Sequence, residues 1–184
     1  MFNHVSRNHP AVQAALDETA GRLNPADNPW HGLVRAHVGD NGEPALDVFE
    51  GHGDLVALDH SADETVDYVV HVMSHWLDRG AAGWRLDAAY AVPSPFWARV
   101  LPQVKAAHPY SWIFGEVIHG DYPRIIEEST MDSITQYELW KSIQHALETE
   151  NFFELDWNLK RHNAFLDSFV PQTFIGNHDV TRIA

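Results

Sequence analysis

Three carboxyl groups in this chain each close or directly follow a short apolar run. Asp87 ends the run GWRLD, Glu116 ends FGE, and Asp179 ends GNHD, which follows the apolar residues Phe174 and Ile175. Runs of this kind predict β-strands. Acids at the ends of several strands, with helical segments between them, are typical of an active site in a β/α protein. The pattern predicts carboxylate chemistry, such as the cleavage of a bond between sugars.

The surroundings of two of these acids predict different roles. Arg85 and Asp87 are two residues apart, so on a strand their side chains leave the same face. A guanidinium beside a carboxylate favours the ionised form, which a nucleophile requires. Glu116 lies among apolar residues, where a carboxyl group holds its proton more readily, as a general acid must. Together they provide the two groups of a retaining glycosidase.

Each of these groups also has a purely structural interpretation. Arg85 and Asp87 could form an ion pair at a strand end, and Glu116 could be a loop acid or a helix cap. His178 and Asp179, adjacent after a strand, could form a hydrogen-bonded pair within a loop. The functional interpretation therefore depends on whether the fold brings the groups together.

The elements that must position these acids alternate after residue 60. We predict strands at 82–87, 111–116, 131–135 and 172–176. We predict helices from the capping box Ser61-Ala62-Asp63-Glu64 to Gly80, from Ser94-Pro95 with a kink or division at Pro102, and over 137–147 and 155–169. Such alternation predicts an α/β fold with a parallel sheet, either open or closed into a barrel. No glycine-rich phosphate loop follows a strand, which favours the barrel.

Composition excludes several classes of partner. The 184 residues predict about one domain, with 12 basic and 26 acidic side chains and a net charge of −14. This charge argues against nucleic acid and gives no attraction to an anionic membrane. With no cysteine, disulfides and thiolate metal sites are excluded. No membrane span or apolar signal segment is present, so we expect a cytoplasmic location.

The ordered motifs resemble those of glycoside hydrolase family 13, the α-amylase family. The run GWRLD is similar to the family's G-x-R-x-D motif, which implies that Asp87 is the nucleophile and Arg85 its partner. FGE implies that Glu116 is the acid/base. The run FIGNHD implies that Asp179 stabilises the transition state and that His178 binds substrate hydroxyls.

The start of the chain resembles the tail of another family motif, D-x-x-x-N-H. It implies that His4 binds substrate and that Asn3 is a candidate calcium ligand. Typical α-amylases carry Lys-His where this chain has Tyr90-Ala91, and that histidine helps to bind calcium. We therefore expect no required cofactor, and the change at Tyr90-Ala91 disfavours calcium at Asn3 without excluding it. The spacing typical of zinc ligands does not occur among five of the histidines, which are His31, His37, His52, His60 and His75.

The resemblance also implies a domain organisation. Residues 1–5 would end the third barrel strand, 6–58 would form a B-domain excursion, and 59–184 would form barrel units up to strand seven and its following loop. From composition, we predict an irregular segment over 24–54 with one short hairpin. The chain is therefore expected to be an internal piece of a TIM (β/α)8 barrel, with exposed sheet edges.

We expect a retaining glycoside hydrolase that acts on α-glucosidic bonds of oligosaccharides or α-glucans. Tyr90-Ala91 favours an α-glucosidase, a maltodextrin-active enzyme or a transglycosidase over a true endo-amylase. Two alternatives remain open: a non-catalytic relative with a carbohydrate-binding or structural role, and a piece that is inactive alone because its barrel is incomplete. The sequence leaves the oligomeric state open.

Overall fold

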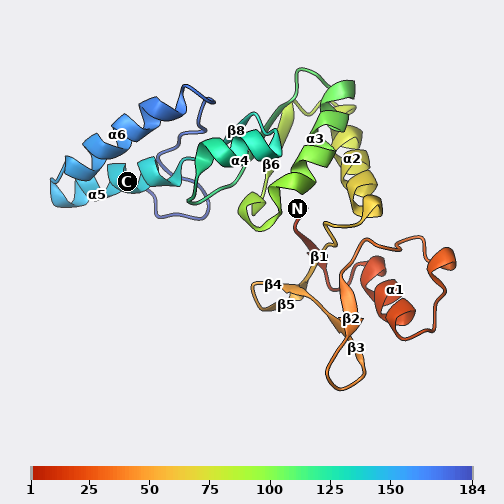
Figure 1. Cartoon of the computed structure of the whole chain (residues 1–184). Helices are drawn as coiled ribbons and strands as arrows, with labels where there is room; N and C mark the ends of the chain where they lie inside the picture. The colour runs from red at the N-terminus through yellow and green to blue at the C-terminus, as the bar shows by residue number, and fades with distance from the viewer. Residues whose placement is uncertain (1, 184) are drawn as a thin grey trace.

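The computed structural model describes residues 2–183 and has two lobes (Figure 1). The N-terminal lobe consists of short antiparallel strands and helix α1. The second lobe consists of a three-stranded parallel sheet with helices α2 to α6, of which α5 and α6 form a hairpin that extends away from the sheet. The predicted α/β class is confirmed by this alternation of parallel strands and helices.

The N-terminal lobe is more regular than its composition suggests. Strand β5 (His52–Ala57) pairs antiparallel with β1 (His4–Ser6) and with β4 (Val48–Phe49), and β2 (Ala36–Val38) forms a hairpin with β3 (Pro44–Leu46). The sequence predicted one short hairpin here, whereas the lobe contains two antiparallel sheets. Among the described residues no ladder joins β1 to the parallel sheet, so its assignment to a barrel strand stays a prediction.

Helix α1 (Pro10–Thr19) was not predicted from the sequence. His9 caps it by accepting the Ala11 N–H at 3.2 Å, and Pro10 takes the first helical position. Its buried face helps to form a separate small core in the N-terminal lobe, made of Ala11, Val12, Ala15, Leu33, Val34, Val56 and Leu58. A short 3-10 turn, η1 (Pro25–Asp27), follows.

The parallel sheet has the order β6-β7-β8. Strand β6 (Gly83–Leu86) pairs with β7 (Trp112–Gly115), and β7 pairs with β8 (Ser133–Ile134). Helix α2 (Asp63–Leu77) precedes β6. The 3-10 turn η2 (Ala89–Ala91) and helix α3 (Ser94–Ala107) connect β6 to β7, and α4 (Tyr122–Ser129) connects β7 to β8. Helices α5 (Tyr137–Thr149) and α6 (Phe153–Phe165) follow β8. Helix α3 packs between α2 and α4. Helix α4 is a further element that was not predicted.

A second, larger core lies between this sheet and its helices. It contains the fully buried side chains of Met73, Trp97, Leu101, Ile113 and Ile134. Phe2 also belongs to it, since its ring lies 5.3 Å from that of Trp84. This core fixes the directions in which β6 and β7 end.

Two predicted helix starts are wrong in detail. Ala62 occupies the N-cap of α2, and the Ser61 hydroxyl donates to Asp59 Oδ1 at 2.6 Å, so no capping box forms. Helix α3 already includes Ser94, with Pro93 as N-cap. Pro102 lies inside this one continuous helix and does not divide it, because the buried face on both sides of the proline stays packed on the core.

The predicted strand over 172–176 is also wrong. Only Gln172 pairs, through a single parallel bridge to Thr135. Gln172 N–H donates to Ile134 O at 2.9 Å, and Gln136 N–H donates to Gln172 O at 3.0 Å. Strand β8 is only two residues long, so it offers no longer ladder to the residues that follow.

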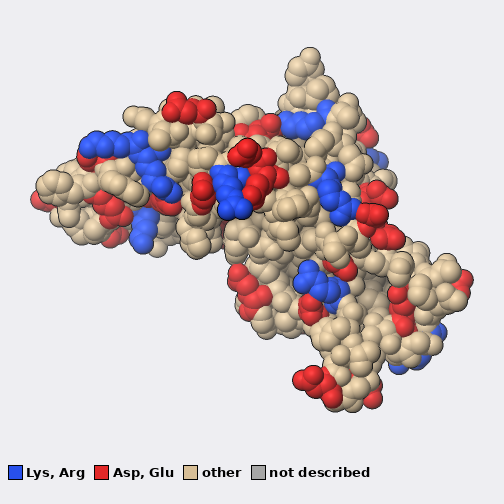
Figure 2. All heavy atoms as spheres, in the orientation of Figure 1, with Lys and Arg blue, Asp and Glu red and all other residues tan. Residues whose placement is uncertain are grey.

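Charged side chains of both signs are interspersed on the face drawn in Figure 2, where Lys and Arg lie next to Asp and Glu. In residues 2–183 no helix combines the length and the hydropathy needed to cross a membrane.

Candidate active site

The ends of β6 and β7 bring two of the predicted acids to one edge of the sheet. Arg85 pairs in register with Phe114 and Leu86 with Gly115, so Asp87 and Glu116 follow neighbouring strands at the same level. The Glu116 N–H donates to Leu86 O at 2.8 Å, which continues the pairing beyond β7. Because the strands are parallel, both acids leave the sheet at its C-terminal edge.

Arg85 joins the three predicted acids. Its Nη1 lies 2.5 Å from Asp87 Oδ1, and its Nη2 lies 2.8 Å from Glu116 Oε1 and 3.6 Å from Asp179 Oδ2. The contact with Asp87 is a hydrogen bond, whereas Nη2 meets Glu116 as an ion pair without hydrogen-bond geometry. Burial alone would lower the pKa of Arg85, but the bond to Asp87 and the surrounding negative charges raise it.

Glu116 is 8% exposed, and its carboxylate faces polar groups. Its Oε2 accepts the Ala88 N–H at 2.9 Å, and its Oε1 accepts the Tyr137 hydroxyl at 3.0 Å. The expectation of an apolar environment is therefore wrong. Ala88 presents its N–H from a left-handed conformation, with φ of 47°, which is uncommon for a residue other than glycine.

Tyr137 is a site residue that sequence reasoning missed. It is 8% exposed, and its hydroxyl accepts a hydrogen bond from Asn177 Nδ2 at 2.9 Å. Burial, with the nearby Glu116 carboxylate, raises the pKa of Tyr137, although the Asn177 bond opposes the shift. The sequence placed this tyrosine in the apolar stripe of a helix. Its position directly after the predicted strand 131–135 was the signal that could have identified it.

Asp179 and His178 lie in a segment without regular secondary structure and are more exposed. The Asp179 and His178 side chains are 46% and 70% exposed, and His178 Nε2 lies 3.2 Å from Asp179 Oδ2. Asn177 Oδ1 accepts the Asp179 N–H at 2.9 Å, which holds the turn. A hollow of about 410 Å³ lies beside this segment, lined by Ile175, Gly176, Asn177, His178, Arg182 and Ile183.

Asn3 and His4 are both buried and contact each other. The Asn3 amide lies 3.3 Å from His4 Nδ1, and the His4 ring stacks on Phe49 at 4.9 Å between centroids. Burial lowers the pKa of His4, and the charge of Asp87 opposes this shift. Within residues 2–183 no ion pair joins His4 to any of the three acids.

No group of three or more His, Cys, Asp or Glu side chains that could hold a metal ion occurs in residues 2–183, and the predictions on calcium stay predictions. One histidine pair on α2 does have a spacing that zinc ligands can use. His71 and His75 have H-x-x-x-H spacing on α2, with ring centroids 6.2 Å apart, but they lie on a helix outside the site.

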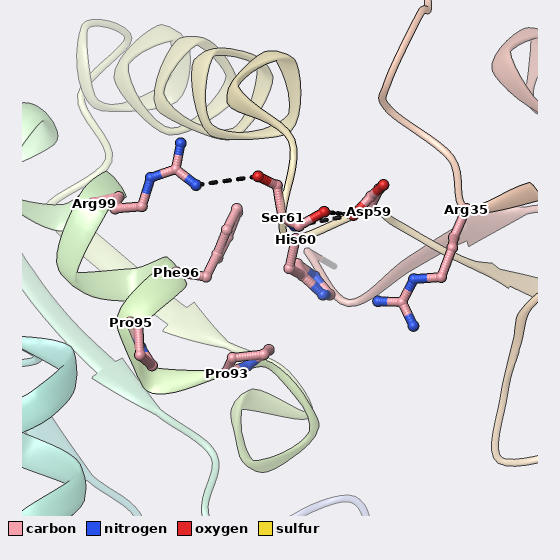
Figure 3. Close-up of a pocket in the computed structure, with 8 residues that line it drawn as sticks. All are labelled: Arg35, Asp59, His60, Ser61, Pro93, Pro95, Phe96 and Arg99. Carbon is pink, nitrogen blue, oxygen red and sulfur yellow. Dashed lines mark hydrogen bonds between the residues drawn. The ribbon is translucent and has the colours of Figure 1, made fainter.

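A further pocket of about 400 Å³ lies between the N-terminal lobe and α3 (Figure 3). Its lining consists of Arg35, Asp59, His60, Ser61, Pro93, Pro95, Phe96 and Arg99. In Figure 3 the Arg99 guanidinium points to Ser61, and the His60 ring lies between Phe96 and Arg35. None of the three acids lines this pocket, so it is separate from the candidate site.

Comparison with known proteins gives a consistent set of relatives. No protein-family model matches the chain. Alpha-amylase 2 of Dictyoglomus thermophilum is 23% identical over 98% of this chain and 31% of its own length. Maltogenic alpha-amylase of Bacillus acidopullulyticus is 25% identical over 100% of this chain and 32% of its own length. The chain therefore spans about a third of the length of these curated relatives.

Solved structures show the same likeness of fold. Maltogenic amylase from S. marinus superposes with a TM-score of 0.79 at 20% identity, over 100% of this chain and 30% of that one. The ligand-free cyclic α-maltosyl-(1→6)-maltose hydrolase from Arthrobacter globiformis gives a TM-score of 0.75 at 20% identity, over 96% of this chain and 40% of that one.

These relatives define the class of protein. They are members of the α-amylase family, glycoside hydrolase family 13, and their structures are TIM-barrel enzymes. This chain is a homologue of one part of them, so the resemblance seen in the sequence motifs is confirmed.

Proposed function

We propose that this chain carries the catalytic groups of a retaining glycoside hydrolase that acts on α-glucosidic bonds. The observation that supports the proposal best is the meeting of three acids around one guanidinium. Asp87, Glu116 and Asp179 come from three different segments that each follow a sheet-pairing residue, and Arg85 lies within 3.6 Å of all of them. An ion pair that served stability alone would need one such acid.

In the proposed reaction the Asp87 carboxylate attacks the anomeric carbon, while Glu116 gives a proton to the departing glycosidic oxygen. The glycosyl–Asp87 ester is then hydrolysed by water, from which Glu116 takes a proton. Asp179, whose carboxylate lies 3.6 Å from the Arg85 guanidinium that also contacts the other two acids, stabilises the positive charge that develops on the sugar ring.

Arg85 has a supporting part in this proposal. Its hydrogen bond to Asp87 Oδ1 fixes that carboxylate in one orientation. His4 and His178 are proposed to bind sugar hydroxyls. His4 is held between Asn3 and Phe49, whereas His178 lies at the exposed rim. No step in this reaction needs a cofactor.

The proposed fold is the middle of a TIM (β/α)8 barrel with an excursion before α2. The order of three parallel strands with helical connections supports it. The proposed substrate is an oligosaccharide or α-glucan. The relatives support this class, since their names include a maltogenic alpha-amylase and a cyclomaltodextrinase, and one solved neighbour is in complex with maltose.

A second candidate is a carbohydrate-binding role without turnover by the isolated chain. It is favoured by the sheet, in which β6 has a neighbour on one side only among residues 2–183. Such an open edge lets the strand ends shift relative to one another.

The test measures hydrolysis of p-nitrophenyl α-glucoside and maltotriose by the purified chain. Asp87→Asn and Glu116→Gln are the key variants, and Asp40→Asn, at an exposed loop acid, is the matched control. We expect turnover in the unaltered chain and the control, and a loss of at least about a thousandfold in Asp87→Asn. Near-normal turnover in that variant would contradict the proposed nucleophile. Binding of maltotriose without turnover by the folded chain would favour the second candidate.

A further inference from the structure

We propose that Tyr137 and Asn177 position the Glu116 carboxyl group for proton transfer and couple it to the Asp179 segment. This inference rests on the proposed function, because it assumes that Glu116 is the acid/base. It assigns a positioning role to two residues that have no direct part in the reaction as described above.

A continuous series of hydrogen bonds connects the two acids. The Asp179 N–H donates to Asn177 Oδ1 at 2.9 Å, and Asn177 Nδ2 donates to the Tyr137 hydroxyl at 2.9 Å. The Tyr137 hydroxyl in turn donates to Glu116 Oε1 at 3.0 Å. The series thus runs from the backbone of one acid to the side chain of another.

The direction of these bonds is fixed by the groups themselves. A phenol has one hydrogen to donate, and an amide nitrogen can only donate. Since Asn177 Nδ2 donates to the Tyr137 oxygen, the single Tyr137 hydrogen is free for Glu116. The amide is oriented by its own Oδ1, which accepts the Asp179 N–H. Each link therefore determines the orientation of the next.

The Tyr137 ring is held by its neighbours so that its hydroxyl stays in place. Phe174 lies edge-on at 4.8 Å and Trp140 at 6.2 Å between ring centroids. The side chain is nearly buried, so water does not compete freely for its hydroxyl. A buried hydrogen bond to a carboxylate costs more to lose than an exposed one.

The remaining contacts of Glu116 explain why a further donor matters. Ala88 N–H holds Oε2, and Arg85 approaches Oε1 without hydrogen-bond geometry. Tyr137 is therefore the side chain that donates a hydrogen bond to Oε1 within residues 2–183. Without it, we expect the carboxyl group to rotate about its last bond.

The first test is spectroscopic and needs no turnover. The chain has five tyrosines, so carbon-13 labelling of the tyrosine ζ position gives signals that Tyr137→Phe assigns. Loss of the carboxylate in Glu116→Gln should lower the pKa of Tyr137, whereas Asn177→Ala should raise it. Glu50→Gln is the matched control, because Glu50 accepts from the Tyr90 hydroxyl at 3.2 Å and should leave the Tyr137 signal unchanged.

The second test is kinetic and separates positioning from folding. Cleavage of maltotriose needs a proton on the leaving oxygen, whereas the fluoride ion of α-maltosyl fluoride leaves with little help from an acid. Tyr137→Phe should lower kcat/KM for maltotriose by about tenfold more than for the fluoride. Tyr90→Phe, which removes the hydroxyl bonded to Glu50, should leave this ratio unchanged.

The outcomes distinguish this inference from the proposed function. An unmoved Tyr137 signal in Glu116→Gln, or equal losses for both substrates in Tyr137→Phe, would overturn the inference alone. Full turnover of maltotriose by Glu116→Gln would overturn the proposed function, even if the Tyr137 signal moved as expected.

Discussion

Arg85 Nη2 lies 2.8 Å from Glu116 Oε1, although Arg85 belongs to β6 and Glu116 directly follows β7. The same guanidinium binds Asp87 through its other terminal nitrogen. One rigid, planar cation thus fixes the relative placement of the proposed nucleophile and the proposed acid. Because both contacts depend on the planar, forked shape of the guanidinium, we expect that position 85 requires an arginine.

Arg85→Lys should therefore be a damaging substitution. A lysine ammonium is a single point of charge and cannot contact Asp87 and Glu116 with the geometry of the guanidinium fork. We expect kcat/KM for maltotriose to fall by about a hundredfold while the fold is kept, as judged by circular dichroism. Arg79→Lys, at an exposed arginine just beyond the C-terminal end of α2, is the control. A decrease of less than about threefold for Arg85→Lys would show that charge alone suffices.

The close pairing of β6 and β7 gives a prediction for stability. A Cβ atom added to Gly83 would lie 1.9 Å from Trp112 O, so an alanine there must push the strands apart. We expect Gly83→Ala to lower the free energy of unfolding by about 3 kcal/mol, measured by urea denaturation. Gly53→Ala is the control, since nothing lies within 4 Å of its added Cβ. Equal stabilities of the two variants would contradict the strand pairing.

The N-terminal lobe contains a pH-sensitive contact, in which His31 Nδ1 lies 2.9 Å from Glu18 Oε1. The bond to Glu18 and its charge raise the pKa of His31. Burial raises the pKa of Glu18, but its bonds to Asn28 and His31 outweigh this and lower it. The His31 contribution is therefore complete below its unfolded pKa and is lost as pH rises through the folded one. The Glu18 contribution is lost as pH falls through its lowered pKa.

His31→Gln tests this contact through the pH dependence of stability. The unaltered chain should exceed the variant in urea midpoint most clearly between about pH 5 and 6, and the difference should shrink towards about pH 8. A difference that grows with rising pH would mean that His31 is stabilised in its neutral form instead. His37→Gln provides a comparison, since His37 lies 3.2 Å from Asp47 on an exposed hairpin.

Much of the second lobe could be predicted from local patterns. Short apolar runs predicted β6 and β7, and apolar residues at helical spacing predicted α2. The N-terminal lobe was harder to predict from the sequence. Helix α1 depends on His9 as a cap and on a small separate core, neither of which leaves a strong periodic signal. The false capping box arose because Ser61 has a nearer partner in Asp59.

The sequence indicated which acids could meet, but it did not indicate the neutral groups that contact Glu116. Asp87 and Glu116 follow apolar runs that form the neighbouring parallel strands β6 and β7, so their meeting at one edge follows from the sheet, whereas Asp179 reaches Arg85 from a segment without regular structure. Tyr137 has an apolar ring that fits a helical stripe, and only the tertiary structure shows where its hydroxyl points. The polar environment of Glu116 was likewise hidden, because it is made by Ala88 N–H in a left-handed turn.

The proposed nucleophile can be identified by trapping. The purified chain is incubated with 5-fluoro-α-glucosyl fluoride, whose glycosyl–enzyme ester hydrolyses slowly, and is then digested and analysed by mass spectrometry. The account predicts one added fluoroglucosyl group on the peptide that contains Asp87, and none in Asp87→Asn. A label on Glu116 or Asp179, or no label on a chain that turns over maltotriose, would contradict it.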